Sequence, residues 1–260
     1  MVKQLLRYPF RLLGYDVIRQ GVTANPLQTV ADPLQTVADL LKGRERPTLF
    51  DVGANVGQTA LQLLSHFPTA SVYSFEPDPV AFQALTIATA GNSRARAFPY
   101  ALGARDESKR FTLNSDSVTN SFLPSSVDPK SVTQGHGSYQ VRDEIDVRVR
   151  RITDVAAELA LDRIDLLKID AQGHDLQVLT GAEELLVRKA IHLIFVEVMF
   201  VPFYDGQCHF DEIVAYLRLR GYNWWIFTIR TYTAIAAYFR PTLSSCPHEI
   251  HDLVVEPYTF

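Results

Sequence analysis

The chain has 260 residues, of which 47% are hydrophobic and 21% charged, a composition typical of a soluble globular enzyme. Its formal net charge of −4 and pI near 6.0 argue against a nucleic-acid partner, which would require a basic surface. With two cysteines there is no disulfide scaffold or structural zinc site to expect, and no apolar run reaches the roughly 18 residues of a membrane span.

The first 45 residues differ from the rest, and we expect an N-terminal helical extension or linker at 1–45 and one domain at 46–260. Basic residues are spread among the leucines of residues 1–20, which leaves open weak peripheral attachment to a membrane surface or a helix packed on the main domain. The same spacing lacks the apolar core of a signal peptide, so a cytoplasmic protein is expected. The heptapeptide PLQTVAD occurs at 26–32 and again at 33–39, too short a repeat for a solenoid or coiled coil.

From residue 47 onward, strand-like and helix-like segments alternate. Strands are predicted at 48–52, 71–76, 95–102, 144–152, 165–170, 192–199, 222–229 and 251–256. Helices are predicted at 58–67, 79–90, 153–160, 176–189 and 210–220. Residues 114–140 are polar and lack periodicity, which indicates a long loop. The alternation predicts an α/β fold, a Rossmann-like three-layer sandwich whose mostly parallel seven-stranded sheet ends in an antiparallel strand.

The first of these strands runs into the sequence DVGANVG, residues 51–57. Ligands of parallel sheets bind beyond the carboxyl ends of the strands, which places this turn at the expected site. A dinucleotide fingerprint fails because Asn55 and Gln58 stand where glycines are required, and a P-loop fails because no Lys-Ser/Thr pair follows. We expect Gly53 to let the backbone approach a ligand and Gly57 to let the next helix start close to the strand.

The second strand ends in SFEPD, which places Glu76 25 positions after Asp51. An acidic residue at this point suits a bidentate grip on a ribose diol, so the ligand is expected to be an adenosine derivative. NAD-binding folds use the same device, and Glu76 alone does not identify the chemistry. The residues predicted to bind the cofactor are Asp51, Gly53, Asn55, Gly57, Glu76, Pro77, Asp78, Ala101 and Leu102.

A third cluster, LLKIDAQGHDLQVLTGAEELL at 166–186, resembles the K-I-D-x-E/Q-G signature of the FkbM-type methyltransferase family. DVGANVGQTA, FEPDP, RITDVAAEL and VEVMFVPFYDGQCHFDEI follow the family order, and the resemblance spans residues 47–256. It implies a class I fold, S-adenosylmethionine as methyl donor, and O-methylation of a hydroxyl on a sugar, glycan or small natural product. The chain departs from the commoner pattern at Gln172 and at His174-Asp175.

A hydroxyl acceptor needs a base or a metal to take its proton. Asp170 is the first candidate base because it ends a strand, and Lys168 either stabilises a developing alkoxide or pairs with Asp170 to fix the strand end. His174, at a helix start beside the expected cleft, is the third catalytic candidate. The residues expected to contact the acceptor are Asn120, Ser121, Gln172, Glu197, Tyr204 and Gln207.

Glu197 interrupts an apolar strand, and together with Asp170 it could share a divalent metal. No close carboxylate cluster supports that arrangement, so a metal is not favoured and no ligands are assigned. Two other functions stay open: an NAD-dependent oxidoreductase, disfavoured by the missing third glycine, and a catalytically silent adenosine-binding domain. The sequence fixes neither the acceptor nor the oligomeric state.

Overall fold

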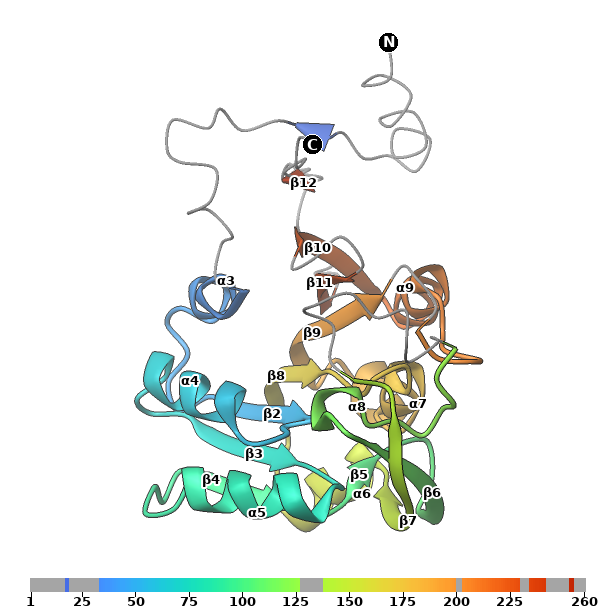
Figure 1. Ribbon diagram of the computed structural model, residues 1–260. Coiled ribbons are helices and arrows are strands. Elements are labelled where there is room, and N and C mark those ends of the chain that lie inside the picture. The colour runs from blue at the N-terminus through green and yellow to red at the C-terminus, as the bar shows by residue number, and fades with distance from the viewer. Residues whose placement is uncertain are drawn as a thin grey trace, which may run out of the picture.

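The computed structural model describes residues 33–126, 138–199, 203–229 and 234–241, and the short paired strands β1 (Val17–Ile18) and β12 (Leu253–Val254). A seven-stranded sheet with helices on both faces forms the centre (Figure 1). Its strands, in spatial order, are β10 (Tyr222–Ile229), β11 (Ala234–Pro241), β9 (Ile191–Met199), β8 (Ile164–Ile169), β2 (Thr48–Val52), β3 (Ser71–Phe75) and β4 (Ala95–Phe98).

Five neighbouring strands, from β9 to β4, are parallel, and β11 runs antiparallel to both β9 and β10. The predicted fold class is therefore confirmed, with one change of position. The antiparallel strand is β11, which directly follows β10, because a short connection between adjacent strands gives an antiparallel pair. The strand predicted at 251–256 lies outside the described residues except for β12, and residues 1–20 lie outside them except for β1.

Two hydrophobic cores fill the two faces of the sheet. One face carries α3 (Pro33–Leu40), α4 (Gln58–His66) and α5 (Pro79–Ala88). The other carries α6 (Ile152–Glu158), α7 (Asp175–Thr180), α8 (Glu183–Val187) and α9 (Phe210–Leu219). Successive strand residues point to opposite faces, so Leu49 packs in the first core and Phe50 in the second. Leu34, Val37 and Leu41 around α3 join the first core, and the domain boundary at residue 45 stays a prediction.

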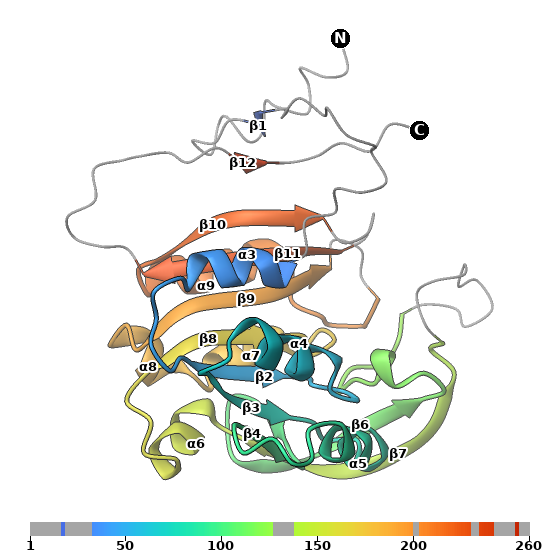
Figure 2. The same cartoon turned by 90° about the vertical axis from the view of Figure 1, so that its left-hand side faces the viewer.

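A smaller three-stranded sheet contains β5 (Ala101–Leu102), β7 (Val141–Arg150) and β6 (Glu107–Asn114), in that order. Figure 2 shows its β6–β7 hairpin beyond the ends toward which β2 and β3 point. The single strand predicted at 95–102 is wrong: it divides into β4 and β5, which belong to different sheets, and Pro99 between them cannot donate a ladder hydrogen bond. The strand β6 was not predicted, because its first half is largely exposed and charged.

The helix predicted at 176–189 is also wrong as a single element, since α7 and α8 are separate. Gly181 lies at the break, where a side chain's Cβ would stand 2.0 Å from the carbonyl oxygen of Gly103. The absence of a side chain thus lets the turn between α7 and α8 pack directly on the residue that follows β5. This contact joins the small sheet to the main one on the α7 side.

Candidate active site

The strand order reverses between β2 and β8, because the chain continues from β2 outward to β3 and β4 and later from β8 outward to β9. Loops that leave the carboxyl ends of two such strands diverge and open a crevice for a ligand. The loop after β2 begins at Gly53, whose N–H donates to Phe75 O at 3.1 Å. The loop after β8 begins at Asp170, whose N–H donates to Val52 O at 3.1 Å. The two loops therefore start side by side.

Asp51 and Lys168 are paired across these strands and form a buried ion pair, with Lys168 Nζ 3.0 Å from Asp51 Oδ1. Lys168 Nζ also lies 3.8 Å from Asp170 Oδ2 and donates to Gly53 O at 3.2 Å. Burial would lower the pKa of Lys168, but the carboxylates of Asp51 and Asp170 outweigh it and raise the pKa above its ordinary value. Lys168 is thus a fixed cation that ties both loops together.

The Asp51 carboxylate is fully buried, and Lys168 Nζ stands 3.0 Å from its Oδ1. Its Oδ2 has no hydrogen-bond donor among the described residues. A buried carboxylate normally accepts several hydrogen bonds, since an unmatched oxygen costs free energy. Asp51 is therefore suited to receive N–H donors from a ligand.

Both glycines of the loop have positive φ angles, +72° for Gly53 and +97° for Gly57. A Cβ on Gly53 would lie 2.0 Å from Asp170 O, and a Cβ on Gly57 would lie 3.0 Å from the Leu85 side chain. At Gly57 the close neighbour is Leu85 of α5, not the strand, so the predicted approach of the next helix to the strand stays a prediction. For Gly53 the structure adds a reason that the sequence did not suggest, namely the close approach of the neighbouring loop's own backbone.

Glu76 lies at the end of β3 with 6% of its surface exposed. Its Oε2 accepts from Asn55 N and its Oε1 from Asp78 N, both at 2.8 Å. Burial raises the pKa of Glu76 to about 7, and the two backbone donors only partly offset that effect. Each carboxylate oxygen has two acceptor sites, so one per oxygen is left for a vicinal diol. Glu76 thus also shapes the loop that carries Asn55.

The residues after Glu76 connect the end of β3 to α5 and to Asn120. Pro77 follows Glu76, and Asp78 Oδ1 caps α5 by accepting from Val80 N at 2.9 Å. Asp78 Oδ2 accepts from Asn120 Nδ2 at 2.9 Å, and Asn120 Oδ1 accepts from Asn114 N at 2.7 Å. Asp78 and Asn120, predicted for cofactor and acceptor, are therefore engaged with each other.

Ala101 and Leu102, also predicted to bind the cofactor, are buried apolar residues of β5 whose backbone pairs with β7. Their side chains offer no polar group, so a role in binding would have to use the backbone or an apolar contact. Ser117, which the sequence reasoning missed, donates from Oγ to Asn55 Oδ1 at 2.9 Å. It connects the loop after β6 to the loop after β2.

A chain of side chains leads from Asp170 to the segment after β9. Gln172 Nε2 donates to Asp170 Oδ1 at 2.7 Å, and Tyr204 Oη lies 2.9 Å from Gln172 Oε1 and 3.0 Å from Thr119 O, its two acceptors. Burial raises the pKa of Tyr204, so its hydroxyl stays protonated. The structure thus brings Lys168, Asp170, Gln172 and Tyr204 together, and Asp170 is the partly exposed carboxylate among them.

Ser121 and Gln207 support this chain from either side. Ser121 Oγ donates to Gln172 O at 2.7 Å, which helps to hold Gln172 at its positive φ of 48°. Gln207 Oε1 accepts from Phe203 N at 2.9 Å and from Tyr204 N at 3.1 Å. Both residues were predicted to contact an acceptor, but their hydrogen bonds here are internal.

His174 and Glu197 occupy different surroundings. His174 is 5% exposed and its ring lies 4.6 Å from that of Phe122; burial lowers the pKa of the imidazole to about 3. It is therefore neutral near pH 7, and this placement supports packing more than proton transfer. Glu197 is a half-buried residue of β9 whose charge acts on Lys168 and Tyr139. Within the described part of the chain, no group of three or more His, Cys, Asp or Glu side chains could hold a metal.

Comparisons with known proteins show the family to which the chain belongs. The family model of the methyltransferase FkbM domain matches residues 51–223. The chain is similar to the 2-O-methyltransferase NoeI of Sinorhizobium fredii, with 30% identity over 174 residues that cover 66% of this chain and 71% of that protein. It is similar to the 31-O-demethyl-FK506 methyltransferase FkbM of Streptomyces tacrolimicus, with 33% identity over 199 residues that cover 69% and 74%. The solved METTL16 methyltransferase domain aligns with a TM-score of 0.47 and 12% identity over 91% of this chain and 76% of that one.

Proposed function

Since the chain belongs to the FkbM methyltransferase family, we propose that it transfers a methyl group from S-adenosylmethionine to a hydroxyl oxygen of a sugar or small natural product. The two relatives described above are named as O-methyltransferases, and one of them acts on a natural product. Within the described residues no helix is both long and apolar enough to cross a membrane. The cytoplasmic location stays a prediction.

The observation that carries the proposal is the pair of buried carboxylates on neighbouring strands, Asp51 and Glu76, on either side of the Gly53–Gly57 loop. Asp51 Oδ2 has no donor among the described residues and suits the α-ammonium of an amino acid. Glu76 has one open acceptor site on each oxygen and suits a ribose diol. S-adenosylmethionine carries both groups in one molecule, and the residues present fit it.

Bound S-adenosylmethionine would supply a methyl group on a positively charged sulfur, already activated for displacement. The chain's own residues must then align the acceptor, keep water out and accept a proton. Asp170 is the base in this proposal, because it is partly exposed at the end of β8 and its two oxygens are oriented by Gln172 and Lys168. Lys168 places a buried positive charge 3.8 Å from Asp170 Oδ2.

The donor assignment is tested by isothermal titration calorimetry with S-adenosylhomocysteine, S-adenosylmethionine and NAD. We expect the first two ligands to bind and NAD to give no heat. Asp51→Asn should weaken S-adenosylhomocysteine binding by roughly ten- to a hundredfold, because a charge-assisted hydrogen bond contributes about 1.5–3 kcal/mol.

Asp211→Asn, an exposed acidic position in the first turn of α9, is the matched control and should bind like the wild type. If NAD binds and S-adenosylhomocysteine does not, the chain is an oxidoreductase and the methyltransferase proposal is wrong. Binding of neither ligand would leave a catalytically silent domain. Equal affinities for Asp51→Asn and wild type would remove Asp51 from the donor site.

A further inference from the structure

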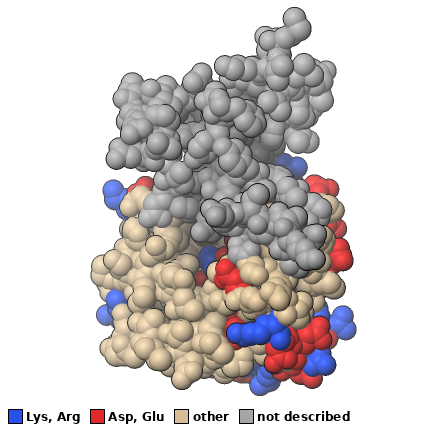
Figure 3. Space-filling model, in the orientation of Figure 1, with Lys and Arg blue, Asp and Glu red and all other residues tan. Residues whose placement is uncertain are grey.

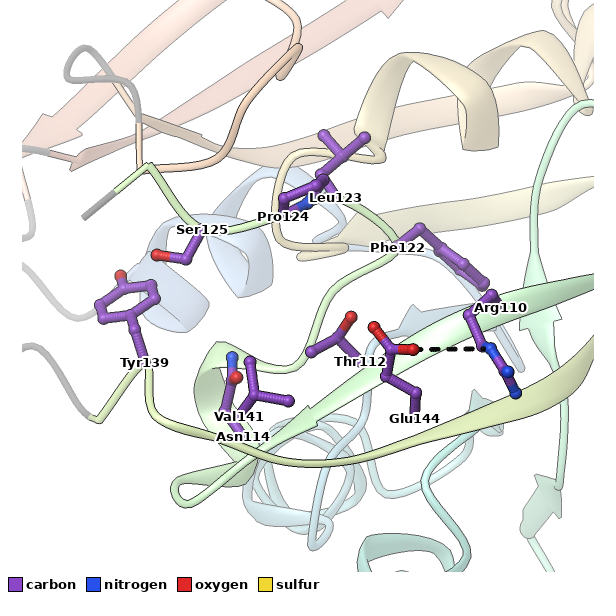
Figure 4. Close-up of a pocket in the computed structure, with 10 residues that line it drawn as sticks. All are labelled: Arg110, Thr112, Asn114, Phe122, Leu123, Pro124, Ser125, Tyr139, Val141 and Glu144. Atoms are coloured by element: carbon purple, nitrogen blue, oxygen red, sulfur yellow. Dashed lines mark ion pairs between the residues drawn. The ribbon is translucent and has the colours of Figure 1, made fainter. Parts of the chain in front are cut away.

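A cavity of about 450 Å³ lies between the antiparallel pair β6–β7 and residues 122–125, and neither Asp51 nor Glu76 is among the residues that line it (Figure 4). Alternate residues of β6 share one face of the strand and line it. Its volume falls within the range of about 300–1,000 Å³ typical of small-molecule sites. The residues used below are Arg110, Thr112, Asn114, Phe122, Tyr139 and Glu144.

Asn114 supplies an unmatched hydrogen-bond acceptor in this cavity wall. The residue is 4% exposed, its Nδ2 donates to Thr119 O at 2.6 Å, and its Oδ1 has no donor among the described residues. The amide cannot be turned over without setting Oδ1 against the Thr119 carbonyl oxygen, so this orientation is the favourable one. A buried acceptor of this kind is matched by a donor, such as a hydroxyl, on a bound molecule.

Aromatic rings form the apolar part of the wall. Tyr139 stacks on Phe203 with ring centroids 5.9 Å apart and an interplanar angle of 2°, which holds it in place. The ring of Phe122 packs against that of Phe111 in β6, with ring centroids 4.9 Å apart. Rings fixed in this way offer flat apolar surfaces to the C–H face of a saturated ring.

The charge at the rim is balanced. Arg110 lies 3.7 Å from Glu144 and 3.6 Å from Asp146, so its positive charge is shared between two carboxylates. Figure 3 shows acidic and basic side chains gathered together over this part of the surface. Because Arg110, the cation among the described lining residues, is already paired, the cavity favours a neutral molecule over a phosphate or carboxylate.

The cavity and the Asp170 cluster share a wall. The ring of Tyr139 lies 5.8 Å from that of Tyr204, whose hydroxyl contacts Gln172, the partner of Asp170. On the other side, Asn114 N donates to Asn120 Oδ1, and Asn120 braces Asp78 beside Glu76. Tyr204 and Asn120, both predicted to contact the acceptor, thus connect the lining of the cavity to the Asp170 cluster and to Asp78.

We propose that this cavity holds the body of the methyl acceptor, a neutral hydroxyl-bearing ring of the pyranoside type, with Asn114 accepting a hydrogen bond from one ring hydroxyl and Tyr139 packing on the ring. The proposal rests on the methyltransferase function given above. It assigns selection of the acceptor to β6, β7 and residues 122–125, and leaves proton transfer to the Asp170 cluster.

The test uses the full chain, saturation-transfer NMR and three probes: methyl β-D-glucopyranoside, methyl α-L-fucopyranoside and the charged methyl β-D-glucuronide. Thr112→Trp fills the cavity from a half-buried position without removing an internal side-chain hydrogen bond, and Asn114→Leu removes the unmatched acceptor. Ser108→Ala, an exposed position on the same strand outside the cavity, is the control. S-adenosylhomocysteine affinity is measured for each variant.

We expect saturation of ring protons of at least one neutral glycoside, a weaker effect for the glucuronide, and at least a fivefold loss in Thr112→Trp with unchanged S-adenosylhomocysteine affinity. Ser108→Ala should match the wild type. Absence of any glycoside signal, or an equal signal in Thr112→Trp, overturns the cavity assignment while the donor titration still supports the methyltransferase. Failure of the wild type to bind S-adenosylhomocysteine overturns the proposed function, and the glycoside signals then report on the cavity alone.

Discussion

The proposed donor edge around Asp51 and Glu76 and the proposed acceptor wall around Asn120 and Tyr204 are built differently. At the donor edge, Glu76 bonds to the backbone 2 and 21 residues away, and the parallel ladder pairs Asp51 with Lys168. At the acceptor wall, Tyr204 Oη reaches Thr119 across 85 positions and Ser121 Oγ reaches Gln172 across 51. The first region follows from the geometry of the sheet, whereas the second depends on side chains brought together by long-range folding.

The two regions also differ in charge. The donor edge buries ionisable groups, of which Lys168 and Glu76 have shifted pKa values, while the acceptor wall is made of amides and phenols. Changes at the donor edge should therefore alter pH dependence and binding of the charged donor. Changes at the acceptor wall should alter the shape of the acceptor site and the orientation of the bound acceptor. The predictions below test this division, from the largest expected effect to the smallest.

Asp170→Asn should have the largest effect, since Asp170 stands where the two regions meet. The amide retains the oxygen that accepts from Gln172 but cannot take a proton, so turnover should fall by about 10²–10⁴-fold. Affinity for S-adenosylhomocysteine should change by less than about threefold, a difference of only roughly 0.7 kcal/mol. Turnover is measured as S-adenosylhomocysteine release, with the exposed Asp162→Asn as control. Full activity in Asp170→Asn would exclude it as the base.

Gly53→Ala tests whether the donor loop depends on backbone contact. Its Cβ would stand 2.0 Å from Asp170 O at a positive φ, so we expect a loss of about 3 kcal/mol or more in unfolding free energy. Gly206→Ala has a similar φ of +78° but nothing within 4 Å of the added Cβ, and should cost only about 1 kcal/mol. Urea unfolding measures both. Equal losses would show that strain, and not the contact with Asp170, governs Gly53.

Glu76 should make stability depend on pH. Its pKa is about 7 in the folded chain against an ordinary value of 4.5, so its proton stabilises the fold below about pH 4.5 and this stabilisation is lost as the pH rises to about 7. The difference amounts to roughly 3 kcal/mol. Relative to Glu76→Gln, wild-type stability should fall by about that amount between pH 4.5 and 8.

Comparison with Glu76→Gln is needed because His174 acts in the opposite direction. With a pKa lowered to about 3, its neutral form stabilises the fold above pH 6.5, and that contribution is lost as the pH falls. It is common to both proteins and cancels in the difference. A difference that does not change with pH would show that Glu76 keeps an ordinary pKa.

Tyr204→Phe should have the smallest effect, because one hydroxyl is lost from the acceptor wall. We expect about 1 kcal/mol of lost stability and a several-fold lower turnover with unchanged donor affinity. Tyr222→Phe is the matched control: it loses a buried hydrogen bond from its hydroxyl to Ile191 O at 2.8 Å, at the start of β9, whereas Tyr204 follows the end of that strand. It should lose similar stability and keep full turnover. Equal turnover in the two variants would deny Tyr204 a part in orienting Gln172.

The difference between features set by local sheet geometry and features set by long-range contacts also explains what could be predicted from the sequence. The bounds of β2 and β10 were predicted as observed, because apolar runs between turn signals are local. The placement of Asp51, Glu76 and Asp170 at one sheet edge follows from the βα order alone. The roles of Asn114 and Tyr139 could not be predicted, since the residues that surround them come from distant segments. The order of residue types along the chain also does not reveal that the Asn120 side chain forms hydrogen bonds with Asn114 and Asp78.

The helix α3 has a consequence for how such a chain can change over generations. It begins at the second copy of PLQTVAD, and its Leu34, Val37 and the following Leu41 pack into the core. A replication slip that deleted residues 26–32 would leave the sequence from that proline onward unchanged, and the same three anchors would dock. Loss of one copy of the heptapeptide would therefore keep every residue by which α3 packs into the core.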